Sequence, residues 1–232
     1  SILMQYLNCI DYIIFLSRNT SQILAKNIKN YRQKVIPLGL QDYWFDSPKP
    51  PLSDSKSPED LTIGYAGALA NHKAPHLLLD AIRQLGWNGT RIRLAGPDSE
   101  PTYRRLLEKK AQGLNVEFVG PVEPDKIPAF LQTIDIFAMT STCLENYPYA
   151  VLEAHATGIP VVGSKVGGIP EQLNNEERLM FEPGSVQGLA NALDFVRCNP
   201  DRIQIPKVTT IDQMTDQTED VYRQAMTANI GS

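Results

Sequence analysis

Cysteine is scarce in this sequence, and no hydrophobic run is long enough to span a bilayer. The three cysteines, Cys9, Cys143 and Cys198, do not have the spacing of metal ligands. A sparse, odd count is typical of free thiols in a reducing compartment. The apolar start, residues 1–16, carries Asp11 and no basic segment, so it does not look like a secretory signal. It also lacks an initiator methionine, and we expect the chain to be part of something longer.

An excess of positive charge is missing as well. The net charge is −4 and the sequence pI is about 5.4, which argues against broad electrostatic binding of nucleic acid or anionic lipid. Neither the dinucleotide fingerprint G-x-G-x-x-G nor the phosphate loop G-x-x-x-x-G-K-[ST] occurs. These absences disfavour a nicotinamide dehydrogenase and a nucleoside triphosphatase.

What the sequence does have is a repeated order of strand, glycine turn and helix. Such alternation predicts an α/β fold, a Rossmann-like parallel sheet with helices on both faces. The expected strands cover residues 61–67, 91–96, 115–120, 134–139, 159–164 and 178–184. The expected helices cover residues 74–86, 100–113, 125–133, 148–158 and 185–198. Residues 11–28 and 34–40 predict one further strand, helix and strand, and a final helix is expected near the end with Thr210 or Asp212 as its cap.

Glycines stand at the ends of several expected strands. They are Gly67, Gly96, Gly120 and Gly163. Ligands of open parallel sheets bind where strands end and helices begin, and glycine lets the backbone approach a ligand closely. We therefore expect the first three of these glycines at one edge of a common site.

Two carboxylates lie close to that edge. Glu145 follows an expected strand, and Glu153 lies inside the next helix, whose first turn suits Pro148. Two carboxylates directed at neighbouring hydroxyl groups suit a ribose and a sugar. For an isolated pair, the alternative is a helix cap at Glu145 and a solvated Glu153.

The surrounding segment is more specific than the pair. It reads TCLENYPYAVLEAHATGIPVVGSKVGGIPEQL, and it resembles the E-x7-E block of the family 4 (group 1) retaining glycosyltransferases of GT-B fold. Upstream, IGYAGALANHKAPHLLLDAI, RIRLAGP and VEFVGPV are similar to that family's preceding segments, and RLMFEPGSVQGLANAL to a following one. The resemblance implies the C-terminal, donor-binding half of such an enzyme.

The resemblance also implies roles for matching residues. Glu153 would hold the ribose hydroxyls of the nucleotide, and Glu145 the hydroxyls of the donor sugar, near the backbone N–H groups of Asn146, Tyr147 and Tyr149. Lys73 would pair with the diphosphate, where a cation can stabilise a charged leaving group. The remaining donor-binding positions would be Gly67, Val119, Gly120, Gly167 and Gly168, with the last two letting a loop lie against the donor.

The sequence departs from the family pattern beside the lysine. Many members have arginine directly after the glycine matched by Gly67 and glycine directly after the lysine; this chain has Ala68 and Ala74. The missing arginine weakens the expected diphosphate clamp, for which His72 is a partial substitute. Asn146-Tyr147-Pro148 replaces a commoner glycine-rich run, which predicts a narrower sugar pocket.

Other conspicuous residues have simpler explanations. We expect His76 at the surface or core edge, His155 packed on the helix side away from Glu153, and Cys143 as a small buried side chain. The basic cluster in residues 104–110 is expected to be a solvated helix face, with membrane contact as a weaker alternative.

The domain division that follows from the resemblance has four parts. Residues 1–45 are the end of an N-terminal acceptor domain and its crossing segment, 46–60 a linker, 61–209 the nucleotide-sugar domain and 210–232 a C-terminal helix. The function implied is transfer of a sugar, a hexose, from a nucleoside diphosphate sugar to a hydroxyl group of a glycan or glycolipid, with retention, as in polysaccharide assembly. The missing N-terminal domain is an expected partner, so the isolated chain is expected to be weakly active.

The resemblance implies no cofactor and no metal. It suggests a cytoplasmic protein, with peripheral contact to the inner membrane face as a further expectation. The alternatives are a non-catalytic nucleotide-sugar-binding module and a sugar-nucleotide epimerase of related architecture. The sequence leaves the base, the sugar and the acceptor open.

Overall fold

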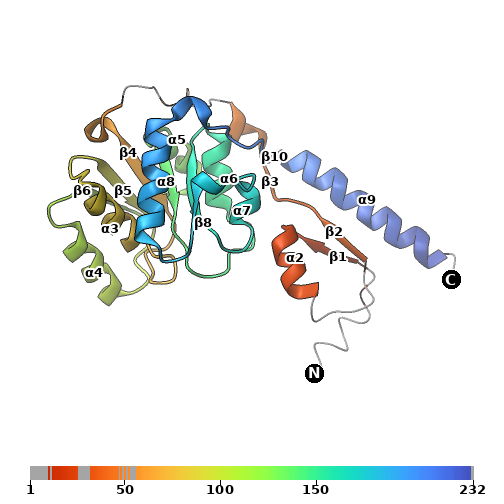
Figure 1. Cartoon of the computed structure of the whole chain (residues 1–232). Helices are drawn as coiled ribbons and strands as arrows, with labels where there is room; N and C mark the ends of the chain where they lie inside the picture. The colour runs from red at the N-terminus through yellow and green to blue at the C-terminus, as the bar shows by residue number, and fades with distance from the viewer. Residues whose placement is uncertain are drawn as a thin grey trace.

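The computed structural model describes residues 10, 12–25, 32–46, 48, 50, 52 and 56–230. Figure 1 shows a large lobe built around a sheet and a small lobe beside it. The small lobe contains β1 (Tyr12–Phe15), α2 (Arg18–Ala25), β2 (Arg32–Val35) and the long α9 (Ile211–Ile230). The hydroxyl of Tyr12 donates a hydrogen bond of 3.1 Å to Gln224 Oε1, which joins α9 to β1.

The large lobe confirms the predicted fold class. Its six strands are all parallel and lie in the order β6-β5-β4-β7-β8-β9, with helices flanking the sheet. The strands are β4 (Thr62–Ala66), β5 (Arg91–Ala95), β6 (Asn115–Gly120), β7 (Ile136–Met139), β8 (Val161–Ser164) and β9 (Met180–Phe181). Every residue of β7 and β8 is buried, as expected for central strands that are covered on both faces.

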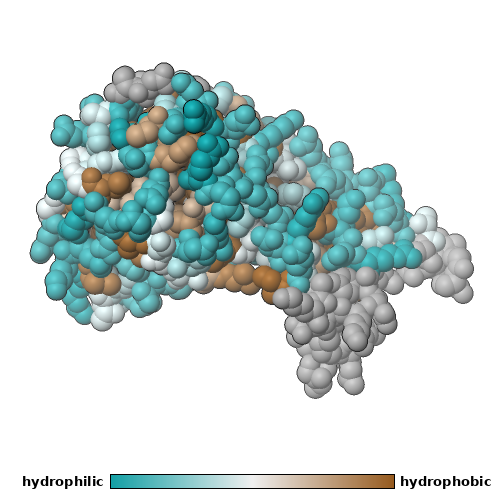
Figure 2. Space-filling model, in the orientation of Figure 1, coloured by the Kyte–Doolittle hydropathy of each residue, from teal (hydrophilic) through white to brown (hydrophobic). Residues whose placement is uncertain are grey.

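The helices of the large lobe follow the predicted alternation. They are α3 (His76–Leu85), α4 (Pro101–Ala111), α5 (Ile127–Gln132), α6 (Tyr149–Ala156), α7 (Ile169–Gln172) and α8 (Val186–Cys198). Short 3-10 turns lie at Asp42–Phe45, Pro58–Asp60, Pro124–Lys126, Glu177–Leu179 and Pro200–Arg202. Figure 2 shows mostly hydrophilic side chains on the visible face of this lobe, since its apolar residues are turned toward the sheet.

The helix ends have local causes in the sequence. Gly86 ends α3 in the left-handed conformation, with φ of 70°, and its N–H bonds back to the last turn. At the start of α9, the N–H of Gln213 donates to Thr210 Oγ1 while the N–H of Thr210 donates to Gln213 Oε1. This reciprocal pair is a capping box, and it confirms Thr210 as the cap.

Two elements differ from the sequence prediction. Residues 34–40 were predicted as one strand, but β2 ends at Val35 and a separate β3 covers Gly39–Leu40. Pro37 lies between them and cannot donate to a strand ladder. β2 pairs with β1, whereas β3 pairs with β10 (Thr209–Thr210), so the two strands belong to different two-stranded sheets. The short α7 was not predicted at all.

The three strand-end glycines share one edge of the sheet, as predicted. The N–H of Gly67 donates to the carbonyl of Ala95 at 3.0 Å, and the N–H of Gly96 to the carbonyl of Gly120 at 2.8 Å. A Cβ on Gly96 would lie 1.8 Å from the carbonyl oxygen of Gly67, so only glycine fits at this point.

The predicted domain boundaries fall near element ends, at β4 and α9, and they remain predictions. Within the described residues, no helix combines the length and the apolar character that a membrane crossing needs.

Candidate functional site

An ion pair lies between the loops that follow two neighbouring strands. Lys73 is in the turn between β4 and α3, and Glu145 follows β7. Because β4 and β7 are parallel neighbours, the loops after them meet at the carboxyl edge of the sheet. Lys73 Nζ lies 2.5 Å from Glu145 Oε1, and the two side chains are 28% and 12% exposed. The structure thus brings together the two residues predicted to handle diphosphate and sugar.

Hydrogen bonds from nearby hydroxyl groups support this ion pair. The Ser141 hydroxyl donates to the same Oε1 of Glu145. The buried Ser164 hydroxyl donates to the carbonyl of Ser141 at 2.6 Å, and the Thr140 hydroxyl to the carbonyl of Lys73 at 2.8 Å. None of these three residues was predicted as part of the site, although the run of hydroxyl side chains after β7, residues 140–142, was a visible signal for Thr140 and Ser141.

Glu153 has a different environment. It lies in α6 and is largely buried, and burial alone raises the pKa of its carboxyl group from 4.5 to about 7. Among the residues that the structure describes, no hydrogen bond or ion pair to this carboxyl group is found. A largely buried carboxyl group without a partner among the described residues is an unusual arrangement, and it can accept hydroxyl hydrogen bonds from a ligand.

His155 occupies the other side of α6. It is 6% exposed, and burial lowers the pKa of its imidazole to about 3, so the ring is neutral at pH 7. This placement agrees with the predicted packing role. His76 is also away from the ion pair: its Nδ1 lies 2.7 Å from the hydroxyl of Tyr103 on α4.

The glycine pair of residues 167 and 168 lies against the chain itself. A Cβ on Gly167 would lie 1.6 Å from the carbonyl oxygen of Glu145, and one on Gly168 would lie 2.1 Å from that of Asn146. The N–H of Gly168 donates to the Glu145 carbonyl at 2.8 Å. The structure therefore shows a close approach of these glycines to the backbone of the Glu145 loop, and the expected contact of their loop with a donor remains a prediction.

Comparison with known families decides what kind of protein carries this site. Residues 52–205 match the family described as glycosyl transferases group 1. The chain belongs to the group 1 glycosyltransferases. The match includes the whole six-stranded sheet, the ion pair, Glu153 and the glycine pair.

Individual relatives of this glycosyltransferase chain are distant. It is 25% identical to D-inositol 3-phosphate glycosyltransferase of Corynebacterium efficiens, over 94% of this chain and 58% of the relative. It is also 25% identical to a component of the phosphatidylinositol N-acetylglucosaminyltransferase of Arabidopsis thaliana, over 94% of this chain and 50% of the relative. The chain thus spans only about half the length of these curated relatives.

Solved structures share the fold. Anabaena HepE, solved with UDP and glucose, has a TM-score of 0.78 at 21% identity and covers 96% of this chain and 66% of its own. Sucrose-phosphate synthase of Thermosynechococcus elongatus has a TM-score of 0.80 at 22% identity, with coverage of 98% and 61%. The group 1 glycosyltransferase chain therefore has the Rossmann-like fold of GT-B enzymes.

The departures beside the lysine can now be placed. Ala74 is fully buried and has φ of 53°, the left-handed conformation that glycine adopts without strain and alanine at about 1–2 kcal/mol. This geometry suits the glycine that the family resemblance led us to expect at this position. Ala68 accepts a hydrogen bond of 2.8 Å from the hydroxyl of Tyr65 through its carbonyl. The His72 side chain is exposed, and its carbonyl accepts from the N–H of Thr142 at 2.8 Å.

The remaining predicted residues lie around the same edge. Val119 and Gly120 end β6, the outermost strand beside β5. A Cβ on Gly120 would meet no described atom within 4 Å, so this end of the sheet is open. Asn146 and Tyr147 continue the Glu145 loop toward α6, and burial together with nearby Glu171 raises the pKa of Tyr147 to about 12.

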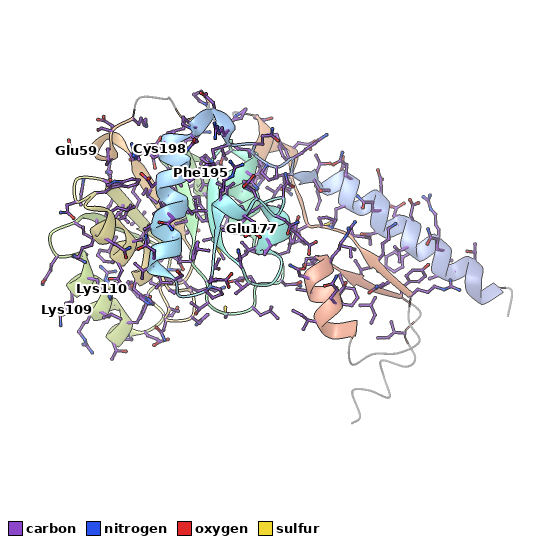
Figure 3. All side chains as sticks on the ribbon, in the orientation of Figure 1. Glu59, Lys109, Lys110, Glu177, Phe195 and Cys198 are labelled. Carbon is purple, nitrogen blue, oxygen red and sulfur yellow. The ribbon has the colours of Figure 1, made fainter. Side chains whose placement is uncertain are left out.

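Two other predictions concern the surroundings of the site. Cys143 is a free thiol whose Sγ lies 3.9 Å from Glu145 Oε1. We expected this side chain to be buried, but it is only half-buried. The basic cluster on α4 is partly neutralised, because Arg104 pairs with Asp98 and Glu108, and Lys110 with Asp80. Figure 3 shows Lys109 and Lys110 at the far end of the large lobe, away from α7 and the small lobe.

The described residues contain no group of three or more histidine, cysteine, aspartate or glutamate side chains that could hold a metal ion. Metal independence remains an expectation.

Proposed function

We propose that this chain carries the donor site of a retaining glycosyltransferase that uses a nucleoside diphosphate sugar. The observation that carries the proposal is Glu153: a largely buried carboxyl group with a pKa of about 7 and no described partner, eight positions after the ion-paired Glu145. Ribose hydroxyl groups would supply the missing hydrogen bonds. Fold neighbour HepE was solved with UDP and glucose, which supports a donor of this class.

The two members of the ion pair would bind different parts of the donor. Lys73 would turn one ammonium hydrogen to the diphosphate while it keeps Glu145 in place, since an ammonium group has three donors. Glu145 would accept hydrogen bonds from the sugar hydroxyls through its second oxygen, because Ser141 and Lys73 both occupy Oε1. This arrangement would orient the anomeric carbon before the reaction.

The reaction proposed conserves the anomeric configuration. The bond between the anomeric carbon and the diphosphate oxygen breaks, and the acceptor oxygen bonds to the same face of that carbon. The acceptor proton passes to the departing diphosphate, whose charge Lys73 stabilises. No group of the described chain forms a covalent intermediate in this scheme.

The acceptor belongs to the part of the proposal that rests on relatives. Those named above act on an inositol phosphate and a phosphatidylinositol by their names, so we propose a hydroxyl of a glycan or glycolipid. From the family resemblance alone, we also propose that this hydroxyl is reached at a cytoplasmic membrane face. A first domain, absent from the matched region, would bind that acceptor and complete the enzyme.

Calorimetric titration with UDP, GDP and ADP, followed by the matching sugar nucleotide, tests the donor site. Glu153→Ala and Lys73→Ala should each weaken the bare nucleotide by about tenfold to a hundredfold, the value of a charge-assisted hydrogen bond. Glu145→Ala should spare the bare nucleotide and weaken the sugar nucleotide. Equal affinities in all variants would mean that these residues are architecture and not a donor site.

A further inference from the structure

The short helix α7 and the glycine loop before it also contact the small lobe. The carboxylate of Glu171 accepts hydrogen bonds from the backbone N–H groups of Arg18, at 2.9 Å, and Asn19, at 2.7 Å. These are the first residues of α2, whose N–H groups have no partner inside the helix. A carboxylate at this end also complements the helix dipole. Asn19 Nδ2 in turn donates a hydrogen bond of 3.0 Å to the carbonyl of Gly167, so both the glycine loop and α7 bond to the start of α2.

The opposite side of the same loop supports the backbone of the Glu145 segment. Gly167 and Gly168 fit against the carbonyl oxygens of Glu145 and Asn146 with no room for a Cβ, and the N–H of Gly168 donates to the Glu145 carbonyl at 2.8 Å. One residue after Glu171, Gln172 Nε2 donates to the carbonyl of Pro148 at 3.1 Å. The loop and α7 therefore hold residues 145–148 at several points along the backbone.

Glu171 thus stands at the middle of a chain of contacts between the two lobes. We infer that Glu171 is a positioning residue for Glu145. Its contact with the first turn of α2 keeps the glycine loop in place, and the glycine loop in turn keeps the Glu145 backbone in the geometry that binds the donor sugar. This inference rests on the proposed function. Its consequence is that the sugar half of the site is complete only while the small lobe is docked. Figure 1 shows α7 at the side of the large lobe that faces α2.

The nucleotide half of the site is held mainly by contacts outside α7, although Lys73 also pairs with Glu145. Lys73 is held by the turn after β4, where its N–H donates to Ala70 and its carbonyl accepts from Thr140. Glu153 is carried by the body of α6. Loss of the Glu171 contact should therefore separate the affinity for a sugar nucleotide from the affinity for a bare nucleotide.

Three variants of the full chain test this: Glu171→Ala, Glu171→Gln and the control Glu182→Ala. Glutamine keeps one oxygen that can accept an N–H, whereas alanine keeps none. Glu182 is 72% exposed and its described ion pair is with Lys165, which has a second ion pair with Glu177. Its loss therefore matches the change of charge and removes none of the contacts described for Gly167, Gly168 and Glu171. The ligands are UDP and UDP-glucose, or the GDP or ADP pair if the base panel selects it.

We expect Glu171→Ala to weaken UDP-glucose by about fivefold to tenfold and to leave UDP within about twofold. Glu171→Gln should recover part of the loss, and Glu182→Ala should show none. Hydrogen exchange should speed up at the amides of both Arg18 and Asn19 in Glu171→Ala, at no more than one of them in Glu171→Gln, and at neither in Glu182→Ala. This readout follows the docking contact directly and does not depend on ligand binding.

Two results would overturn the inference. Faster exchange with an unchanged ratio of the two affinities would make Glu171 a purely structural contact. Unchanged exchange would mean that the contact does not hold α2 in solution. If the wild-type chain binds neither ligand, the proposed function fails and the positioning role fails with it, whereas the exchange result still reports separately on the docking contact.

Discussion

Glu153 and His155 lie two positions apart on α6 and show how one helix provides two environments. Burial opposes charge on both side chains, raising the pKa of the carboxyl group and lowering that of the imidazole. His155 is almost fully buried and neutral at pH 7, so its burial costs little free energy of folding. Glu153 retains some access to solvent and titrates near pH 7, where a ligand that binds the carboxylate would lower its pKa.

The raised pKa predicts an unusual dependence of stability on pH. The pKa of Glu153 is about 7 in the folded chain and 4.5 in its ordinary environment, so folding favours the protonated form. As the pH rises from 4.5 to 7, the unfolded chain loses this proton first, and the free energy of unfolding falls. Glu153→Gln has no proton to lose. We expect it to match the wild type near pH 4.5 and to be more stable at pH 8 by up to about 3 kcal/mol.

Urea unfolding of both chains at pH 4.5, 6 and 8 measures this difference. Glu182→Gln is the control, because it makes the same chemical change at a side chain that is 72% exposed. A difference between Glu153→Gln and the wild type that is the same at all three pH values would show that the carboxyl group does not titrate in this window.

The loop before α7 is the element on which most of the site's backbone geometry depends. Gly167 combines φ of 54° with a Cβ position 1.6 Å from the carbonyl oxygen of Glu145. Gly184 has φ of 83° but no described atom within 4 Å of its Cβ position. The two glycines therefore separate conformational strain from steric overlap.

We expect Gly184→Ala to lower the free energy of unfolding by about 1 kcal/mol, the cost of alanine in a left-handed conformation. Gly167→Ala should cost about 3 kcal/mol or more, because the loop must move off the Glu145 backbone as well. Denaturant unfolding of the two variants beside the wild type measures both. Similar losses would show that the loop relaxes away from Glu145 without difficulty.

The elements of the sheet could be predicted because their signals are local. Apolar runs that end in glycine mark β4, β5 and β6, and helical spacing marks α3 and α8. Residues 34–40 were wrongly predicted as one strand, although Pro37 could have indicated the split, since proline interrupts a strand. The different partners of β2 and β3 had no signal in the sequence.

The site was predictable only in part. Resemblance to a family singled out Lys73, Glu145 and Glu153, but not the direct bond between the first two, which are 72 positions apart. The four-residue α7 is too short to show a period. The partners of Glu171 lie 153 and 152 positions away in the sequence, and no local pattern predicts them.

At the scale of the whole molecule, the two lobes are joined by two crossing segments that pair with each other. β3 lies parallel to β10, with Gly39 opposite Thr209 and Leu40 opposite Thr210. A Cβ on Gly39 would lie 2.3 Å from the carbonyl oxygen of Thr210. The N–H of Gly39 also contacts Met214 Sδ at 3.3 Å, so the first crossing meets the second where α9 begins.

Gly39→Ala should therefore act on the arrangement of the lobes more than on the sheet. The added methyl group forces the crossings apart at the capping box of α9, and α9 carries the contact between Gln224 and Tyr12. We expect faster hydrogen exchange in the first turn of α9 and in β1, and a larger radius of gyration in solution scattering. Amides of β7 and β8 should keep their protection, because these strands are buried in the centre of the large lobe.

Gly113→Ala is the control for general destabilisation, since Gly113 has φ of 78° and no described atom within 4 Å of its Cβ position. It carries the strain of a left-handed alanine without touching the crossings. If both variants changed exchange in α9 equally, the effect would come from general destabilisation. An effect confined to Gly39→Ala would mean that the paired crossings set the docking of the small lobe. The contact between Glu171 and α2, and with it the Glu145 loop, should then loosen in the same variant, because α2 belongs to the lobe that these crossings carry.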